Sequence, residues 1–553
     1  MPSTPAAIGG DPRRNLFWQS RRAGKGPAHA FTAAAQEHAM LIRNKAIHAS
    51  VDPTATRRDF LKKAAVAAAV PSVVGVTSCA PDSPARTRPG VAPPGTDPAL
   101  QADLEEALAR HGVVGVSAAV FANGEIRTAA AGLVNVSSGV TMTPETVMHI
   151  GSITKIFNTT LLMQMVDDGL VELDAPVSTY LPELRLADPD HLARITVGML
   201  VNHTSGIDGE MVPEQGHDEE IIEKAIPRFA GMGKIHEPGA DASYCNTATV
   251  IAGYLCQRIR ERSWYDLVKE RIFQPLGMEH AAVLPEDALL HRASVGHFTS
   301  PETGEPVRTS FAFLPISFAP AGATAMMSAS ALVTFAAAHM ADGTGPNGAT
   351  ILTPASARAM RAETTRVRGE GAPIAFGLGW MLSEGGFVSH GGGGPGILAN
   401  LIAHPESNVV VAVLGNSSHS GGLTSELSAK WLEEAAGVAP PAPVVRPIVD
   451  GEVDIARYAG RYENVAQIYE IAEMPGQLAG TLGVSLWARF PFYDDTPMEP
   501  TPQIPLMPVG NDAFTFPDPE GNPTAAIMSF LDPRPDGRMS YIAQGARMVP
   551  RAD

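Results

Sequence analysis

Apolar and polar positions follow two different periods in the first part of the chain that has a regular pattern. Residues 97–110 have the pattern of a helix, whereas residues 113–121 and 126–131 are short apolar runs on either side of Asn123-Gly124. Asn-Gly between two such runs is a strong signal for a two-residue hairpin turn. The pattern therefore predicts a helix followed by a β-hairpin.

A second set of regular elements is predicted near residue 400. Residues 397–403 and 409–414 are typical of strands joined by a polar turn at 405–408, and residues 423–436 have the pattern of a closing helix. The strands at 113–131 and those at 397–414 would form one antiparallel sheet. The helices between them in the sequence would form a second lobe, with a site in the cleft. The predicted fold class is α/β (α+β), an antiparallel sheet flanked by helices plus a helical lobe.

The composition changes after Pro440, Pro441 and Pro443. Beyond them lie short alternating segments, separated by Pro, Gly and Asp clusters, which predict a small all-β antiparallel barrel or sandwich. The clearest of these segments are 466–472, 478–487 and 525–531. The expected organisation is a targeting segment at 1–78, a Pro-rich tether at 79–97, a first folded domain at 98–437, a linker at 438–449 and the β-domain at 450–553.

One Ser-x-x-Lys, from Ser152 to Lys155, lies where an extended segment at 147–150 becomes a helix. Ser152 would then lie in the first turn, where backbone N–H groups point toward a bound group, and Lys155 would stand on the same face. A serine hydroxyl needs such a neighbour to take its proton before it can attack a carbonyl. Alone, however, a Ser-x-x-Lys is more often a simple helix cap, so further residues have to decide.

Two further motifs follow, Tyr244-Cys245-Asn246 and His390-Gly391-Gly392, the second after a predicted strand at 386–389. Neither is specific alone, but their order after Ser-x-x-Lys is. On these residues the chain resembles the serine beta-lactamase and penicillin-binding-protein superfamily, in particular its class C-like branch of esterases, D-aminopeptidases and related peptidases. The resemblance spans roughly residues 98–436 and includes Asn202-His203-Thr204-Ser205-Gly206, Pro275-Leu276-Gly277-Met278 and Phe376-Gly377-Leu378-Gly379-Trp380.

The resemblance implies a role for each motif. Ser152 would attack a carbonyl and form an acyl-enzyme that water hydrolyses, while Lys155 and Tyr244 share the proton transfer. Both free pKa values lie near 10, so each must be shifted before the group can act as a base at neutral pH; which of the two takes the proton stays open. The backbone N–H groups of Ser152 and Gly393 would form the oxyanion hole. Substrate would contact Asn246, His390 and Gly392.

His390 is a departure from the penicillin-recognising members, whose third motif begins with lysine. Lysine suits a substrate carboxylate, whereas histidine is mostly neutral at pH 7. A peptidase or amidase acting on small or linear peptides, including D-residue or nonribosomal peptides, is therefore preferred. An esterase or beta-lactamase-type hydrolase with the same residues is the alternative, and a catalytically idle tethered binding or filament-forming protein is a third.

The N-terminal segment predicts export. Arg57 and Arg58 precede a short apolar run at 64–76, and the whole resembles a twin-arginine signal that ends in a lipoprotein box at Cys79. Met40 is the predicted start of the protein. The run is too short for a membrane span of about 20 residues. The prediction is a periplasmic protein, lipid-anchored through Cys79; without that modification the segment would be a plain cleavable signal or an uncleaved anchor.

Charge and composition narrow the partners. Residues 1–78 carry a net charge of +7 and residues 79–553 one of −24, so the exported part would repel nucleic acid and anionic lipid head groups. No cofactor or metal is expected, because the sequence contains no phosphate-binding loop and no His/Cys cluster at metal spacing. Cys245 and Cys256 are expected as free buried thiols, although they could pair in an oxidising periplasm. Tyr458-Ala459-Gly460-Arg461-Tyr462 resembles the start of the lipocalin-like domain of some D-aminopeptidase-type members, which would shape the cleft, mediate homo-oligomerisation or serve as a lid.

Overall fold

The computed structural model describes residues 95–210, 216–218, 220–300, 302–369, 374–449, 451, 453–474, 482–488, 503–518 and 520–552. The predicted export signal with Arg57 and Arg58, the proposed lipidation site Cys79 and the tether as far as residue 94 lie outside the described residues.

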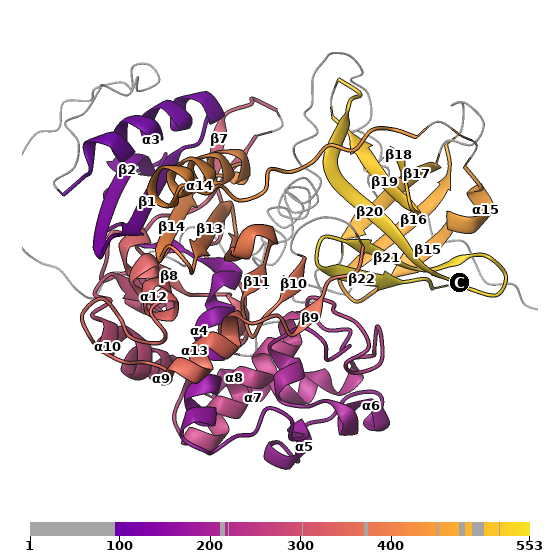
Figure 1. The fold of residues 1–553 in the computed structure, drawn as a ribbon, viewed down its shortest axis with the longest axis horizontal. Helices are drawn as coiled ribbons and strands as arrows, with labels where there is room; N and C mark the ends of the chain where they lie inside the picture. The colour runs from indigo at the N-terminus through magenta and orange to yellow at the C-terminus, as the bar shows by residue number, and fades with distance from the viewer. Residues whose placement is uncertain are drawn as a thin grey trace, which may run out of the picture.

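A nine-stranded antiparallel sheet forms the centre of the larger part of the molecule (Figure 1). Its order is β3-β2-β1-β14-β13-β12-β11-β10-β9. The strands are β1 (Gly115–Ala122), β2 (Glu125–Asn135), β3 (Val140–Thr141), β9 (Thr365–Arg366), β10 (Ala375–Phe376), β11 (Met381–Leu382), β12 (Val388–Gly394), β13 (Ile397–His404) and β14 (Val409–Gly415). Because β1 pairs with β14, both ends of the region contribute to one sheet, which confirms the predicted fold class.

Two helices cover one face of this sheet, α3 (Pro98–His111) and α14 (Gly421–Ala436). Alternate residues of β14 serve the two faces, as the period of a strand requires. Val411 and Val413 pack with the core that contains Trp431 of α14, whereas Val410 and Ala412 pack on the opposite side, toward the helical lobe. The sheet is therefore buried on both faces.

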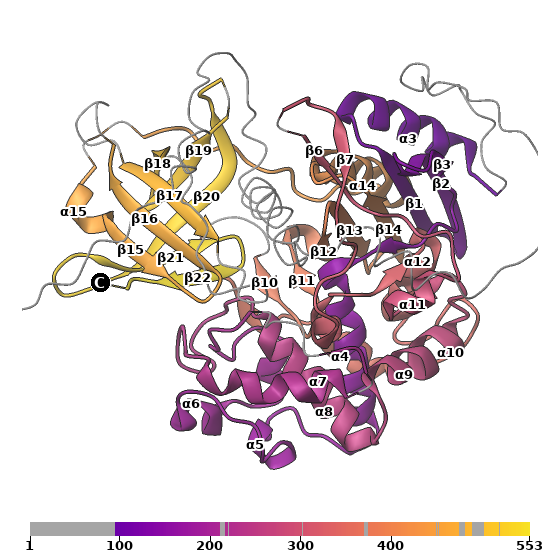
Figure 2. The same ribbon diagram turned by 180° about the vertical axis from the view of Figure 1, so that it is seen from behind.

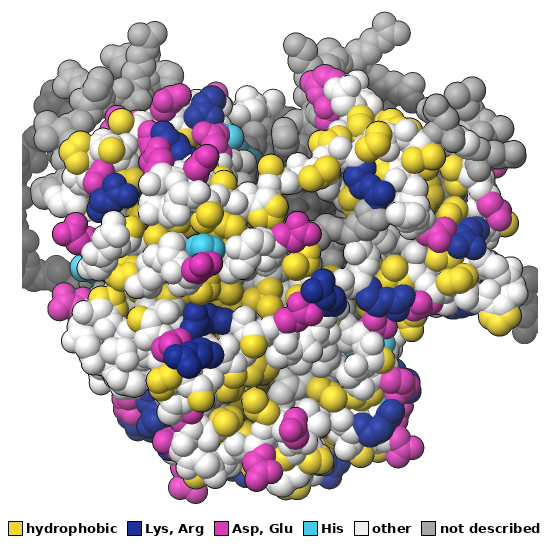
Figure 3. Space-filling model, viewed as in Figure 1, with side chains coloured by type: hydrophobic (Ala, Val, Ile, Leu, Met, Phe, Trp, Pro, Cys, Tyr) yellow, Lys and Arg dark blue, Asp and Glu magenta, His cyan; other side chains and the backbone are white. Residues whose placement is uncertain are grey.

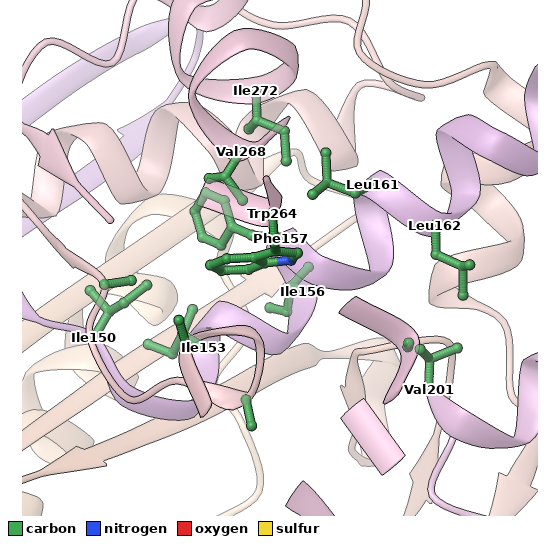
Figure 4. Close-up of a cluster of buried hydrophobic side chains, with 14 of the residues drawn as sticks. Ile150, Ile153, Ile156, Phe157, Leu161, Leu162, Val201, Trp264, Val268 and Ile272 are labelled. Atoms are coloured by element: carbon green, nitrogen blue, oxygen red, sulfur yellow. The ribbon is translucent and has the colours of Figure 1, made fainter. Parts of the chain in front are cut away.

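The helical lobe surrounds one buried helix, α4 (Thr154–Asp167). Every α4 residue from Thr154 to Met165 is buried, and its polar side chains, such as Asn158 and Gln164, hydrogen-bond to neighbouring backbone carbonyls. Figure 4 shows Ile156 and Phe157 of α4 beside the indole ring of Trp264. The remaining helices are α5 (Val177–Tyr180), α6 (Pro189–Arg194), α7 (Ile221–Ala225), α8 (Asn246–Arg260), α9 (Trp264–Val268), α10 (Gln274–Leu276), α11 (Pro285–Ala288), α12 (Ala329–Met340) and α13 (Pro354–Arg361).

Short strands complete this part of the molecule. A three-stranded sheet has the order β4-β8-β5, and β6 pairs with β7. They are β4 (Met148–His149), β5 (Ala281–Ala282), β6 (His297–Thr299), β7 (Pro306–Arg308) and β8 (Met326–Met327).

The C-terminal part is an eight-stranded antiparallel barrel in which each strand pairs with the next. The first strand of the barrel contacts the residues that follow the last strand. Tyr462 forms a β-bridge with Arg551, and the Ala552 N–H donates to the Arg461 carbonyl at 2.8 Å. The predicted all-β domain is thus confirmed, and of the two predicted alternatives it is a nearly closed barrel and not a sandwich. After α15 (Ile455–Tyr458), its strands are β15 (Gly460–Glu463), β16 (Gln467–Glu473), β17 (Leu482–Ala488), β18 (Ile504–Gly510), β19 (Ala513–Pro517), β20 (Pro523–Pro533), β21 (Met539–Gln544) and β22 (Arg547–Pro550).

The barrel packs against the part of the larger domain that holds β9 (Figure 1) and the loop before α8. Figure 2 shows the same region from behind, where β10, the neighbour of the edge strand β9, marks this end of the sheet. Arg368, which follows β9, donates to both carboxylate oxygens of Asp532 in β20 at 2.8 and 2.6 Å and also pairs with Asp241. The Tyr541 hydroxyl in β21 donates to the Ile235 carbonyl at 3.3 Å. These contacts fix the hairpin of β21 and β22 at the edge of the helical lobe.

Acidic and basic side chains are interspersed over the face seen in Figure 3, and they do not gather there into one basic patch. Among the described residues, none of the helices combines the length and apolar character needed to cross a membrane.

Candidate active site

The predicted nucleophile lies on a tight turn between a strand and the buried helix. A 3₁₀ turn, Gly151–Ile153, joins β4 to α4, and Gly151 has a left-handed φ of 52°. His149 holds this turn from inside: its Nδ1 accepts from the Gly151 N–H at 3.1 Å, and its Nε2 donates to the Ala323 carbonyl at 2.9 Å. Ser152 is thereby presented at the start of α4, as the sequence predicted.

Lys155 stands one turn further along and faces Ser152. Its Nζ lies 3.1 Å from the Ser152 Oγ and 2.6 Å from the Ala321 carbonyl oxygen. The side chain is buried, which penalises the ammonium form and lowers the pKa of Lys155 to about 7. A large fraction of the amine is therefore neutral at neutral pH and can accept a proton.

Tyr244 comes from the loop before α8 and completes a cluster with Lys155. The Lys155 Nζ is 4.7 Å from the centre of the Tyr244 ring. Burial raises the pKa of Tyr244 well above its ordinary value, and a hydrogen bond with Ser152 only partly opposes this. The phenol therefore stays protonated near neutrality, and of the two candidate bases Lys155 is the one that can take a proton there.

The third motif lies within a strand. The sequence placed a strand at 386–389 with the motif after it, which is wrong at both bounds: Glu384–Gly386 is a 3₁₀ turn, and β12 runs through His390 and the glycines to Gly394. Strand propensity is low for glycine, and here pairing with β13 overrides it.

The glycines of β12 allow the strand to lie directly against the nucleophile turn. A Cβ on Gly392 would overlap the Ile150 carbonyl oxygen, and a Cβ on Gly151 would lie 2.5 Å from the backbone nitrogen of Gly393. The amides of Ser152 and Gly393, the predicted oxyanion donors, therefore belong to adjoining segments.

His390 is a neutral, buried residue of this strand. Its Nδ1 lies 2.6 Å from the Gly391 carbonyl oxygen, which makes Nδ1 the protonated nitrogen, and its ring centre lies 6.1 Å from that of Tyr244. Burial, together with the nearby charge of Lys155, lowers the pKa of His390 to about 3. In the part of the chain that the structure describes, its Nε2 has no hydrogen-bond partner. The third motif therefore presents an acceptor, where lysine would present a cation.

Asn246 is held by a hydrogen bond to Glu210, a residue that the sequence did not single out. It is the first residue of α8, is buried, and its Nδ2 donates to Glu210. The Thr247 hydroxyl also donates to the Glu210 carbonyl at 2.8 Å. Glu210 carries no motif and was missed, because only the fold brings it beside α8.

Cys245, predicted from the sequence as a free buried thiol, also caps α8. It is buried, and its Sγ accepts from the Ala248 N–H at 3.4 Å. Burial raises the pKa of the Cys245 thiol to about 12, so it is not a nucleophile at neutral pH. Cys245 and Cys256 are both buried and free, as predicted.

The barrel contributes directly to the second motif. The Tyr244 N–H donates to the Ala546 carbonyl at 2.8 Å, and the Met548 N–H donates to the Ser243 hydroxyl at 3.1 Å. Between them Arg547 forms an ion pair with Glu210, and its Cζ lies 5.2 Å from the centre of the Tyr244 ring. Sequence reasoning missed Arg547 because it lies in a different domain, with no local pattern around it.

Metal-ligating groups do not gather in this site. Among the described residues no three His, Cys, Asp or Glu side chains lie close enough to hold a metal ion.

The fold and the Ser–Lys–Tyr cluster define a serine hydrolase. The chain belongs to the beta-lactamase family, whose model matches residues 100–435.

Three proteins illustrate the similarity. Penicillin-binding protein 4 of Amycolatopsis lactamdurans is 32% identical over 358 residues, which cover 64% of this chain and 94% of that protein. A D-aminopeptidase of Gluconobacter oxydans is 29% identical over 215 residues, 37% of this chain and 39% of that protein. The crystal structure of SurE aligns with a TM-score of 0.64 at 25% identity over 82% of this chain and 98% of that one, and the structure of SurE with D-Leu aligns with a TM-score of 0.63.

Proposed function

We propose that this protein is a peptidase or amidase that cleaves small or linear peptides through an acyl-enzyme on Ser152. The observation that carries the proposal is the 3.1 Å contact between the Lys155 amine and the Ser152 hydroxyl, combined with a lysine pKa of about 7. A nucleophilic serine needs a neighbouring base that is neutral at working pH, and this geometry supplies one.

In the proposed reaction, Lys155 takes the Ser152 proton as the Oγ attacks the substrate carbonyl. The negative charge on the carbonyl oxygen would be held by the N–H groups of Ser152 and Gly393. Tyr244, which burial keeps protonated, would pass a proton to the leaving amine and recover it from Lys155. Water would then attack the acyl carbon along the reverse path and release the acid.

The neutral His390 supports an amide substrate that carries no fixed carboxylate at the third motif. The D-aminopeptidase relative and the SurE complex with D-Leu support a peptide with a D-residue next to the scissile bond. Linear nonribosomal peptides belong to that chemical class.

Activity-based labelling tests the acyl-serine mechanism. We expect a fluorophosphonate probe to label the wild-type protein and Ser117→Ala, whose buried serine lies in β1 outside the site, but not Ser152→Ala. Equal labelling of Ser152→Ala would refute Ser152 as the nucleophile.

A substrate panel tests the reaction class. Peptides with L- or D-residues on either side of the scissile bond are compared with p-nitrophenyl esters and nitrocefin, at matched concentrations. The proposal predicts the highest kcat/KM for a peptide or amide. The relative named Penicillin-binding protein 4 supports a beta-lactam as a ligand, so a beta-lactam hydrolase with the same residues is the second candidate. Faster turnover of nitrocefin than of every peptide would establish that candidate instead.

We further propose that the chain works in the periplasm after twin-arginine export, anchored through Cys79. Cell fractionation should place the wild-type protein in the membrane fraction, Cys79→Ala in the soluble periplasm, and a double Arg57→Lys, Arg58→Lys variant in the cytoplasm. Cytoplasmic wild-type protein would contradict the proposal.

A further inference from the structure

The turn between β21 and β22 of the barrel is built into the second motif of the hydrolase domain. The Ala546 carbonyl in this turn accepts from the Tyr244 N–H at 2.8 Å, and the Met548 N–H in β22 donates to the Ser243 hydroxyl at 3.1 Å. Tyr244 is therefore positioned by the barrel as well as by its own domain. A domain that served only as a distant lid or an oligomer contact would not need this arrangement.

Arg547 is the first residue of β22, directly after that turn, and it bridges two parts of the site. Its guanidinium pairs with Glu210, whose carboxylate also accepts from the Asn246 side chain. The same guanidinium lies 5.2 Å from the Tyr244 ring centre, within the range of a cation–π contact. The Glu210 side chain is only 9% exposed, so without Arg547 a nearly buried carboxylate would lose its charged partner, which is costly.

Charge around Lys155 gives Arg547 a second task. In the described chain, the titratable and charged groups around the Lys155 amine come from both domains. They are the hydroxyls of Ser152 and Tyr244, the Cys245 thiol, the imidazoles of His203 and His390, and the charged pair Glu210 and Arg547. Burial keeps His203 and His390 neutral, with the pKa of each lowered. Arg547 is thus the cation that faces the cluster from outside the motifs, at a site whose third motif supplies none.

We propose that Arg547 is a positioning residue of the hydrolase site: through Glu210 it fixes the Asn246 side chain, and it keeps a positive charge against Tyr244 and Lys155, so that barrel and hydrolase domain form one catalytic unit. This inference rests on the proposed function, because it concerns the same acyl-transfer site. It also assigns the barrel the cleft-shaping role that the sequence left open.

The two members of the ion pair act on Lys155 in opposite directions. Arg547 lowers the pKa of Lys155, and Glu210 raises it. If Lys155 must be neutral to accept the Ser152 proton, the rate of serine modification rises through its pKa as pH increases. Removing Arg547 should therefore shift the acid limb of the pH profile to higher pH, and removing the Glu210 charge should shift it to lower pH.

The test measures the second-order rate of Ser152 labelling by a fluorophosphonate at a series of pH values on both sides of neutrality. Five forms of the full-length chain are compared: the wild type, Arg547→Gln, Arg547→Lys, Glu210→Gln and the control variant Arg538→Gln. Arg538 pairs with Asp536 in the turn before β21 and lies outside the site. Circular dichroism and thermal unfolding check that each variant is folded.

We expect Arg547→Gln to label about tenfold more slowly or worse, the scale of one lost charge-assisted hydrogen bond. Its acid limb should move to higher pH, that of Glu210→Gln to lower pH, and Arg547→Lys should keep the wild-type limb because it keeps the charge. If Arg547→Gln does not fold, the other two variants test the inference: the acid limb of Arg547→Lys should match that of the wild type, and the acid limb of Glu210→Gln should lie at lower pH.

Several results would overturn the inference. One is a folded Arg547→Gln with the rate and profile of Arg538→Gln, and another is limbs that move in the same direction in Arg547→Gln and Glu210→Gln. A third is a loss in Arg547→Gln confined to peptide substrates with a free carboxylate and absent for their amides, which would make Arg547 a substrate-binding residue. Failure of the wild type to be labelled at all is a different result, because it refutes the proposed function.

Discussion

The Lys155 Nζ lies 3.1 Å from the Ser152 Oγ, at a position where the lysine side chain is only about 1% exposed. Burial has two consequences for this pair. It brings the pKa of the lysine to about 7, so that the amine can act as a base, and it places an ionisable group in a core where its charged form is poorly solvated. Catalytic competence and folding stability therefore depend on the same feature in opposite ways.

The first prediction concerns the pH dependence of catalysis. Because neutral Lys155 is the base, kcat/KM should rise with pH through an apparent pKa of about 7. The measurement is kcat/KM for a p-nitrophenyl ester or an active peptide against pH. A profile that is flat across neutrality, or that rises only near the pKa of free lysine, would argue that Lys155 is not the base.

Tyr244→Phe removes the hydroxyl that is proposed to pass the proton to the leaving group. Since a positioned acid or base is typically worth 10²–10⁴ in rate, we expect kcat to fall by about that factor. The matched control is Tyr254→Phe, another buried tyrosine, whose hydroxyl bonds to Glu183 away from the site. Comparable kcat values for the two variants would remove Tyr244 from the mechanism.

The glycines of β12 provide a geometric test. In Gly392→Ala the new methyl group would overlap the Ile150 carbonyl oxygen, so β12 must move away from the nucleophile turn. Overpacking of this kind costs roughly 1–3 kcal/mol, and the oxyanion donors would separate. Gly391→Ala is the control, because its methyl group would have nothing closer than 4.0 Å. We expect a lower Tm and a large loss of kcat in the first variant only; equal effects would mean that this close approach is not what the site requires.

Most of the framework could be predicted from local sequence. The helix at 97–110, the hairpin around Asn123-Gly124 and the barrel segments are set by periodicity and turn chemistry, which act over a few residues. The predicted nucleophile Ser152 and its neighbour Lys155 come together because the 3₁₀ turn at Gly151–Ile153 runs directly into α4 and fixes their i, i+3 spacing.

The rest depends on tertiary contacts that leave no local signal. Glu210 and Arg547 form their ion pair only because the barrel packs against the helical lobe. The strand through His390 was misplaced because glycine-rich sequence has little strand propensity, while pairing with β13 still stabilises it. Close approach between β12 and the turn at Gly151 is likewise visible only once the sheet is formed.

Stability at mild acidity should depend on His390. Its pKa is about 3 in the folded protein and returns to about 6.5 on unfolding. Between these values the unfolded state binds a proton that the folded state does not, so the free energy of unfolding falls as pH drops below about 6.5. The slope for one such group approaches about 1.4 kcal/mol per pH unit. Urea denaturation at pH 7 and pH 5 should show a smaller loss in His390→Gln than in wild type, with the exposed-histidine variant His419→Gln as control. An unchanged loss in His390→Gln would contradict the prediction.

Lys155→Met should be inactive yet more stable than the wild type at pH 7. The folded state lowers the pKa of this lysine from 10.5 to about 7, so below pH 7 the wild type carries the full penalty of burying the amine, and the penalty disappears as pH rises toward 10.5. The shift corresponds to roughly 4–5 kcal/mol, from which the lost hydrogen bond to the Ala321 carbonyl subtracts about 1–3 kcal/mol. We therefore expect a net gain of about 1–4 kcal/mol at pH 7 in the free energy of unfolding, measured by urea denaturation. This gain should shrink as pH rises from 7 toward 10.5 and then reverse, because only the lost hydrogen bond remains once the penalty is gone. A variant that is less stable than wild type at pH 7, or a gap that is independent of pH, would show that the buried amine carries no such penalty.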